Sequence, residues 1–509
     1  MIDRRQTASH ARARRRAAAC AIAATTLLGA CAVGPSYHRP KVDAAAGFKE
    51  AGDWKPSEPA DVLDRGHWWE IFKDDDLNKL EAKIDISNQT VKAAADAFDQ
   101  SRALLSEARA GFWPTVGASV SKVFSGGGSG SAVITGAGGT GATGTGTGTG
   151  GTGTGSSLSL LHKSGITDTA GLSGSWDLDI WGKIRRTTEN ARDTAQASAA
   201  ALAAARLSAQ AQLATDYFEL RAQDQLQKLL DDTVEAETQS LHITESRYKF
   251  GVAARADVVS AETQLLGSQA QQVNAKIQRG ILEHAVAVLV GQQPAMFALG
   301  PSVMRSDVPT VPAGVPSALL ERRPDVAESE RTVAAANAEI GVAEAAYFPD
   351  LTLTGSDDYS SNTFRHLISL PNRVWSWGPS LAETIFDGGL RHAQVKAARA
   401  QHDVTVDNYR QTVLTAFQQV EDDIVTLRVL EQQAVIEDKT VAAAREAEKL
   451  TLNQYKAGTV PYSSVISAQT TRLSAEQTAL SVLSQRLQTS VALVEALGGG
   501  WKAQDLPLP

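Results

Sequence analysis

A duplicated unit constrains this chain more than any other feature: a short alternating segment followed by a very long helical one. In the first copy, residues 172–180 alternate apolar or small side chains with polar ones, a period of two that is typical of a strand with one apolar face. A run without proline then extends from Gly182 to Gly251, and as a helix it would be about 100 Å long. The second copy repeats this run over the same 69 positions, from Gly389 to Gly458. Any fold for the chain must therefore accommodate two strand-and-helix units.

Both helical runs end in the same turn sequence, in which a tyrosine precedes a glycine by three positions. Glycine often ends a helix in the left-handed conformation, so each turn is predicted to reverse the chain into a shorter return helix. The return segments also match, since DVVSAET after the first turn corresponds to SVISAQT after the second. The turn residues are Tyr248 and Gly251 in the first copy, and Tyr455 and Gly458 in the second.

The first 30 residues have the pattern of a lipoprotein signal peptide. Six arginines precede a short apolar region, residues 17–28, and the small residues Gly29 and Ala30 lie directly before Cys31. This pattern predicts cleavage before Cys31 and a covalent diacylglycerol and N-acyl lipid on that cysteine. The alternative is a chance cysteine after an ordinary signal. The only other cysteine, Cys20, lies inside the signal, so no disulfide or thiol-based site is expected in the mature chain.

The charge balance and the motif content argue against nucleic-acid binding and against enzymatic activity. Removing the predicted signal, with its six arginines and one aspartate, from 49 basic and 57 acidic residues leaves a net charge of −13. The sequence has no P-loop, zinc motif or nucleophile elbow, and no cofactor beyond the lipid on Cys31 is expected. Residues 136–141 formally match a dinucleotide-binding fingerprint, but no helical pattern follows them.

The order of these patterns predicts two repeats between an N-terminal arm and a short tail. The predicted segments are a signal peptide at 1–30, an extended arm at 31–75, repeat 1 at 76–300, repeat 2 at 301–501 and a C-terminal tail at 502–509. The predicted strands are about 115–124 and 169–181 in repeat 1, and about 350–359 and 374–386 in repeat 2. A single helix is expected at 76–110, and the loop 125–168 is rich in Gly and Thr. Trp68 and Trp69 are expected to dock the arm against the helical body.

The lengths of these elements indicate a membrane-associated oligomer. Strands of about ten residues cross a bilayer when tilted. Four such strands are too few to close around a lumen, and open sheet edges are not tolerated in lipid, so strands from several copies must close together. The long helices exceed the thickness of a membrane and must extend into the periplasm. Tryptophans near the strands fit the aromatic belts of membrane interfaces: Trp176, Trp181, Trp375 and Trp377.

With these features, the chain resembles the outer-membrane efflux lipoproteins of the TolC/OprM (NodT) family over essentially its whole length. The motifs that carry the resemblance are CAVGPSY from Cys31, Trp68-Trp69, Arg322-Arg323-Pro324-Asp325, Trp377-Gly378-Pro379, Ile385-Phe386-Asp387-Gly388-Gly389 and Gly498-Gly499-Gly500-Trp501. The resemblance implies a mixed α+β membrane protein in which each chain gives four strands to a trimeric, twelve-stranded β-barrel. That barrel would continue into a periplasmic α-helical barrel with an equatorial domain.

The resemblance also implies a function, that of the outer-membrane channel in a tripartite efflux system. Such a lipid-anchored homotrimer extends into the periplasm and conducts substrates passively, after engagement by a periplasmic adaptor protein and an inner-membrane efflux pump, here expected to be a multidrug pump of the RND type. The residues implied are Tyr248, Gly251, Tyr455 and Gly458 for adaptor docking at the periplasmic tip, and Asp257, Ser464 and Ser467 for the pore entrance. The alternative is a structural or adaptor-type periplasmic lipoprotein without channel activity.

One departure from the family concerns charge at the pore entrance. Family members often carry acidic residues at the positions of Ser464 and Ser467, where they form an anionic ring. We therefore expect this gate to be held by helix packing and hydroxyl hydrogen bonds more than by charge. Arg472 lies nearby in the sequence and is a candidate partner for Asp257 or Glu262.

Overall fold

A computed structural model of the chain describes residues 32–42, 47–51, 67–125, 165–309, 311 and 322–501. The predicted signal peptide, Cys31, most of the loop 125–168 and the tail 502–509 lie outside the described residues. The chain divides into two compact units. One contains Arg109–Ile184 and Ala345–Gly389 and carries the strands; the other contains Val33–Ala108, Arg185–Glu344 and the chain from Leu390 onward, and carries most of the helices. Both units therefore draw on both halves of the sequence.

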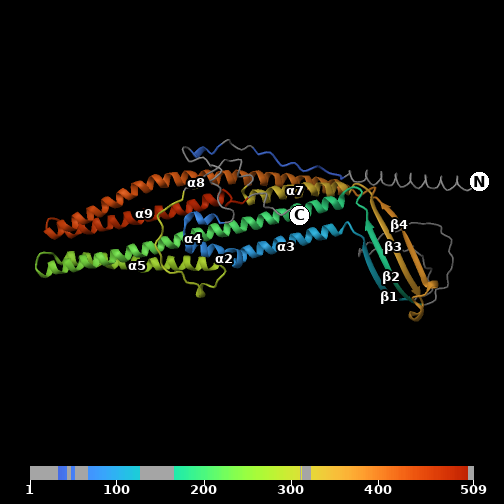
Figure 1. Ribbon diagram of the computed structural model, residues 1–509, viewed down its shortest axis with the longest axis horizontal. Helices are drawn as coiled ribbons and strands as arrows, with labels where there is room; N and C mark the ends of the chain where they lie inside the picture. Colours follow the sequence, from blue (N-terminus) through green and yellow to red (C-terminus); the bar gives the residue numbers. More distant parts are fainter. Residues whose placement is uncertain are drawn as a thin grey trace, which may run out of the picture. The chain divides into compact units, whose positions relative to one another are not determined.

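The strand unit is one antiparallel sheet in which the strands follow sequence order (Figure 1). The strands are β1 (Thr115–Ser125), β2 (Gly165–Asp177), β3 (Asp350–Ser361) and β4 (Arg373–Ala382). In the register, Thr115 lies opposite Ser175, Trp176 opposite Leu353, and Leu351 opposite Leu381. The two central strands, β2 and β3, come from different halves of the sequence, so the sheet joins the two repeats.

Two strands end about four residues earlier than the alternation in sequence predicts. β2 ends at Asp177 and not near 181, because the Asp179 carboxylate accepts a hydrogen bond from the N–H of Ile184 at 3.0 Å, at the start of the next helix. β4 ends at Ala382 and not near 386. There, Asp387 accepts a bond from the N–H of Gly389 at 2.9 Å, in a turn that places Gly389 at φ 93.

The helical unit is built on two helical hairpins (Figure 1). In the first, the 67-residue helix α4 (Lys183–Lys249) is followed by α5 (Arg255–Leu289), and in the second the 68-residue helix α8 (Leu390–Ala457) is followed by α9 (Tyr462–Ala496). The two very long helices predicted from the sequence are thus confirmed. The shorter helices are α2 (Asp75–Ser87), α3 (Gln89–Ala110) and α7 (Pro324–Ala345). Among the helices that the structure describes, none has an apolar stretch long enough to cross a membrane.

The prediction of a single helix at 76–110 is wrong, because the segment is divided into α2 and α3 at Asn88. The backbone of Asn88 is extended, with φ −66 and ψ 123. Its side-chain oxygen accepts hydrogen bonds from the N–H groups of Thr90 at 2.9 Å and Val91 at 3.1 Å, which caps the N-terminus of α3. Its amide nitrogen donates to the carbonyl of Leu289 at 2.8 Å. The break therefore also fastens α2 and α3 to the end of α5.

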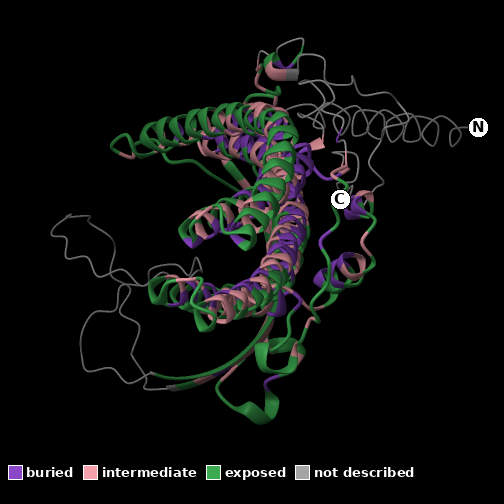
Figure 2. Ribbon diagram, turned by 90° about the vertical axis from the view of Figure 1, so that its left-hand side faces the viewer, coloured by how far each residue is buried: buried purple, intermediate pink, exposed green. Residues whose placement is uncertain are grey.

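The main core of the helical unit lies where the short helices and the arm meet the long ones. Trp68, Trp69 and Phe72 are buried in a short 3-10 helix, and the rings of Phe72 and Phe218 are 4.9 Å apart. The expectation that these tryptophans dock against the helical body is confirmed. In Figure 2, buried residues recur along the long helices; the remaining residues of α8 are mostly exposed, whereas those of α4 are mostly of intermediate burial.

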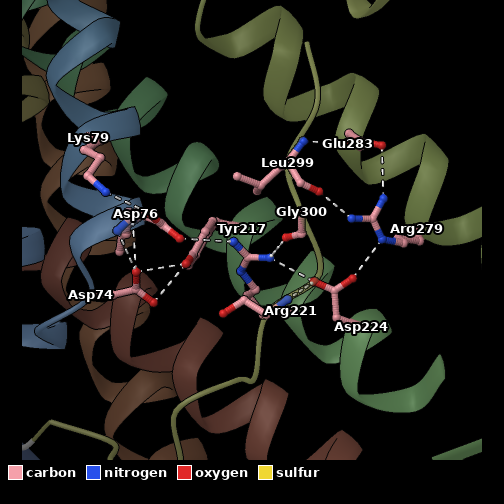
Figure 3. Close-up of polar contacts among 12 residues, drawn as sticks. Asp74, Asp76, Lys79, Tyr217, Arg221, Asp224, Arg279, Glu283, Leu299 and Gly300 are labelled. Atoms are coloured by element: carbon pink, nitrogen blue, oxygen red, sulfur yellow. Dashed lines mark hydrogen bonds and ion pairs between the residues drawn. The ribbon is translucent and has the colours of Figure 1, made fainter. Parts of the chain in front are cut away.

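A buried ionic network secures the connection that follows α5 (Figure 3). The Arg221 guanidinium donates to Asp224 at 2.9 Å and to the carbonyl of Gly300 at 2.8 Å. Arg279 donates to the other oxygen of Asp224 at 2.8 Å and pairs with Glu283 at 3.1 Å. Buried charges stay stable only when they are paired in this way, so the network fixes residues 299–300 against α4 and α5.

Candidate functional site

The first candidate surface is one face of the sheet, which is lined with hydroxyl groups. Because side chains alternate along a strand, residues opposite each other in the register share a face. On this face the hydroxyls of Ser121 and Thr169 are 2.6 Å apart, and those of Ser356 and Ser376 are 3.1 Å apart. Asp358 adds a carboxylate opposite Gly171. Asp177 and Asp350 share this face, so it is polar, readily wetted and acidic.

The opposite face of the sheet is mainly apolar and exposed, and its charged side chains form two ion pairs, Lys122 with Asp168 and Arg373 with Asp357. Val116 and Val120 in β1 are each 74% exposed, and Trp377 in β4 is equally exposed. Three of the tryptophans expected at a membrane interface, Trp176, Trp375 and Trp377, lie on this face. Trp181 does not: it stacks on Phe348 with ring centroids 4.8 Å apart. An apolar face of this size is unfavourable in water, so it requires a lipid or protein environment.

The second candidate site comprises the turns that end the two hairpins, which have the same backbone geometry. Gly251 and Gly458 have φ values of 75 and 81, so the predicted left-handed helix ends are observed. In both turns the glycine N–H donates to the carbonyl of the preceding tyrosine, Tyr248 or Tyr455, at 2.9 Å. The sequence repeat is therefore a repeat of structure at these positions.

The side chains of the two turns have different environments. Tyr248 is 42% exposed, whereas Tyr455 is 3% exposed. The Tyr455 ring packs against Tyr462 at 5.1 Å, in a cluster that also contains Ala261 and Val465. Tyr455 therefore links α8, α9 and α5, while Tyr248 faces outward. Nothing in the repeated sequence distinguishes the two tyrosines, because their burial depends on which helices face them.

Arg247 connects the two hairpins at this end. Its guanidinium donates to the carbonyl of Lys456 at 2.8 Å and lies 4.7 Å from the centre of the Tyr455 ring. The Tyr455 hydroxyl lies 3.4 Å from that of Thr244, also on α4. We name Arg247, Tyr455, Lys456 and Thr244 the tip contact. Sequence reasoning missed Arg247; its place directly before Tyr248 in the turn was the available signal.

The residues predicted at the pore entrance lie at the starts of the return helices. A carboxylate oxygen of Asp257 accepts from the N–H of Ala254 at 3.4 Å, at the N-terminus of α5. Ser467 is exposed, and its hydroxyl donates to the carbonyl of Ser463 in its own helix at 3.1 Å. Ser464 is half-buried. The serine hydroxyl of 467 is thus used within α9 and not across the interface.

The expectation that Arg472 pairs with Asp257 or Glu262 is wrong. Arg472 forms ion pairs with Glu448 and Glu476, both at 2.5 Å, and these three side chains are largely buried. Arg445 binds the other oxygen of Glu476 at 2.6 Å. The i, i+4 spacing of Arg472 and Glu476 was a signal for this pairing.

A further polar layer lies between the hairpins, toward the tip contact. Glu237 on α4 accepts a bond from Gln264 on α5 at 2.9 Å, and burial raises the pKa of its carboxyl above the usual range. Gln469 on α9 donates to the hydroxyl of Ser240 on α4 at 3.2 Å. In the part of the chain that the structure describes, no group of three or more His, Cys, Asp or Glu side chains is arranged to hold a metal ion.

Comparison with known proteins places these features in a family. The profile of the family described as "Outer membrane efflux protein" matches residues 82–292 and 315–499. A relative in Pseudomonas putida, the probable efflux pump outer membrane protein TtgC, is 30% identical over 486 residues, which is 94% of each chain.

Solved structures agree with this assignment. The outer-membrane channel OprN has 27% identity and a TM-score of 0.81, covering 92% of this chain and 100% of that chain. The open state of the MtrE outer membrane channel of Neisseria gonorrhoeae has 26% identity and a TM-score of 0.78, covering 93% and 99%. From the family profile, the relative and these structures together, the chain belongs to the outer membrane efflux protein family, whose fold and location it shares.

Proposed function

We propose that this chain is the outer-membrane channel of a tripartite efflux system of the RND type and has no enzymatic activity of its own. The observation that carries the proposal is the sheet, with one face of hydroxyls and the other of exposed apolar side chains. Such a sheet suits a wall with water on one side and lipid on the other. Each of the 67- and 68-residue helices directly follows a strand in the sequence, as a periplasmic extension of that wall requires.

The functional form is a homotrimer. The four-stranded sheet ends in two open edges, β1 and β4, and three copies would close it into a twelve-stranded barrel. The helices carry a matching signal, because six apolar residues on α5 are each at least 45% exposed and lie 7, 7, 4, 4 and 7 positions apart on one face. They are Val259, Leu266, Val273, Ile277, Ile281 and Val288. This stripe suits a seam between copies in a helical barrel.

The turn residues divide into a docking surface and a gate. Tyr248, Gly251 and Gly458 are exposed, so they are available to a periplasmic adaptor protein that also binds an inner-membrane efflux pump. Tyr455, also expected to be a docking residue, is buried and belongs to the gate. Asp257, Ser464 and Ser467 line the entrance near it. The lipid on Cys31, a diacylglycerol with an N-acyl chain, anchors the arm to the outer membrane.

The closed gate is held chiefly by contacts within one chain and not by an anionic ring. The tip contact and the Gln469–Ser240 bond hold α8 and α9 to α4. These contacts, and not hydrogen bonds from the hydroxyls of Ser464 and Ser467, keep the gate closed. A gate of this kind should be little affected by trivalent cations. Strong block by such cations from the periplasmic side of single channels would contradict it.

Planar-bilayer recording of the purified protein tests the proposal. We expect small, brief openings in the unaltered protein and a several-fold larger, steadier conductance in Arg247→Ala, because that change removes both the carbonyl bond and the ring contact. The matched control is Arg255→Ala, which removes a cation–π contact with the exposed Tyr248. The absence of conductance in all three proteins would favour a structural lipoprotein, and equal conductance in all three would overturn the gate.

A further inference from the structure

The described part of the N-terminal arm is bound along the helical unit by specific contacts. Arg186 on α4, 8% exposed, donates from Nε to the carbonyl of Val33 at 3.0 Å and from Nη2 to that of Gly34 at 3.2 Å. Gly34 has φ 101, and a Cβ atom on it would lie 2.5 Å from the Cα of Gly341 on α7. The arm and α7 thus approach backbone to backbone, at a point where only glycine fits.

The next residues of the arm bind α7 and α8. The Tyr37 hydroxyl donates to Glu330 at 2.6 Å, and the Arg331 guanidinium lies 5.8 Å from the centre of its ring. Asn337 donates to the carbonyl of Pro35 at 3.1 Å. Beneath these bonds, Tyr37 packs on a buried cluster shared by α7 and α8, which consists of Val326, Val333, Tyr409, Val413 and Ala416.

A second described segment of the arm continues along α8. The backbone N–H groups of Lys49 and Glu50 donate to the two carboxylate oxygens of Glu421 at 2.7 and 2.9 Å. Arg428 in turn donates to the backbone carbonyl of Glu50 at 3.1 Å and pairs with its carboxylate. Phe48 is buried in the main core. A mere tether between an anchor and a folded body would need none of these contacts.

The positions of these contacts are unevenly distributed along α8. Among the described residues, those of α8 that contact the arm lie between Tyr409 and Arg428, whereas the turn of this hairpin is at Gly458. From Arg428 to the turn, the polar contacts of α8 with other helices are with α4 and α9, through Arg445, Glu448, Tyr455 and Lys456. Among the arm residues that the structure describes, none is recorded in a contact with the part of the hairpin that leads to the gate.

We propose that the arm is a strap that locks α4, α7 and α8 into one rigid block, so that gate opening is confined to the hairpin beyond Arg428. The strap joins α4, from the first sequence repeat, to α7 and α8, from the second, and it is independent of the contacts at the turns. This inference rests on the proposed function, because it concerns which part of the helices moves when the channel opens. It also gives the segment after the anchoring cysteine a role beyond tethering.

The first test asks whether the arm stays bound without covalent continuity. A protease recognition sequence is inserted within residues 52–66 of the full chain, and the purified, C-terminally tagged protein is cleaved in detergent and captured. We expect the arm peptide to be retained by the body and its retention to fall at least tenfold in the arm-side variant Gly34→Ala/Tyr37→Phe. The control Lys41→Ala alters an exposed arm residue and should retain the peptide. Loss of the peptide from the unaltered protein would overturn the strap.

The second test uses hydrogen–deuterium exchange on the uncleaved chain. In Gly34→Ala/Tyr37→Phe, the amides of α7 and of α8 between Tyr409 and Arg428 should exchange at least tenfold faster, while those beyond Arg428 should be unchanged. Because both substitutions are in the arm, they leave every side chain of the body intact. Unchanged exchange in the first region, or an equal rise along all of α8, would overturn the proposal. Neither readout requires conductance, so failure of the channel assay would be distinguished from failure of the strap.

Discussion

The two helical hairpins have nearly the same length and the same backbone turn, yet the side chains at their turns have different environments. In the first hairpin, Tyr248 faces solvent and the buried acid Glu237 is bonded by an amide. In the second, Tyr455 is buried, and the buried acid Glu476 is paired with two arginines. Identical backbone turns thus support two roles. The first hairpin offers an outer surface and supplies Arg247, and the second is the element that Arg247 holds.

Substitution of the two turn tyrosines should distinguish the hairpins most clearly. Tyr455→Ala removes a buried ring from the cluster with Tyr462 and should lower the free energy of unfolding by about 3 kcal/mol. Tyr248→Ala removes an exposed ring and should change it by less than about 0.5 kcal/mol. Thermal unfolding followed by circular dichroism at 222 nm measures both.

Tyr455→Phe separates packing from hydrogen bonding in that experiment. It keeps the ring and removes only the hydroxyl, which lies at the long distance of 3.4 Å from Thr244, so most of the stability should remain. Equal shifts in Tyr455→Ala and Tyr248→Ala would mean that the hairpins are equivalent in solution.

The ionic networks supply the second contrast. Glu476→Gln leaves the largely buried Arg472 and its neighbour Arg445 without one carboxylate and should cost roughly 2 kcal/mol. The control is Glu446→Gln, which removes a surface pair with Lys449 at 3.7 Å and should cost less than about 0.5 kcal/mol. Urea unfolding in detergent compares the two variants. An equal, small loss in both would show that Arg472 finds sufficient partners in Glu448 and solvent.

The repeated patterns were readable from the sequence because they are local. Apolar alternation places the four strands, and the absence of proline with a closing glycine places α4 and α8 within a few residues. The failures share one cause. Asn88 divides a helix because its side chain caps α3 while its amide reaches Leu289, about 200 positions away. The strand ends at 177 and 382 likewise depend on carboxylates that serve the following helix or turn.

The candidate site was predictable in its backbone and not in its side-chain contacts. The left-handed conformations of Gly251 and Gly458 follow from the turn sequence alone. The burial of Tyr455 and the contacts of Arg247 depend on how α4 faces α8 and α9, which no periodicity encodes. Arg472 lay within reach of several acids in the sequence, and only the fold selects Glu448 over Asp257 and Glu262.

Substitution of the turn glycines should affect the two hairpins equally, because their backbone conformations match. Gly251→Ala and Gly458→Ala both force a side chain into positive φ, at a cost of about 1 kcal/mol each. A Cβ on Gly251 would meet no atom within 4 Å, and one on Gly458 would lie 3.6 Å from Nη2 of Arg247, an ordinary contact. The two shifts in thermal midpoint should therefore be nearly equal. A much larger loss in Gly458→Ala would indicate that the Arg247 contact is tighter than this distance implies.

Glu237, the buried acid of the first hairpin, should give the stability of the protein a weak dependence on pH. Burial raises the pKa of its carboxyl, and hydrogen bonds from Ser268 and Gln264 only partly oppose this. Because the folded-state pKa is above the unfolded one, the protonated form favours folding; the full contribution is present below about pH 4.5 and is lost as pH rises through the folded pKa. Glu237→Gln should remove this decline, so that the variant matches the unaltered protein at pH 4 and is slightly more stable than it at pH 8. Thermal midpoints at the two pH values measure the difference, and a variant less stable at pH 8 would show that the ionised carboxylate is stabilised by Arg472 across the interface, which would make the acids of the two hairpins alike.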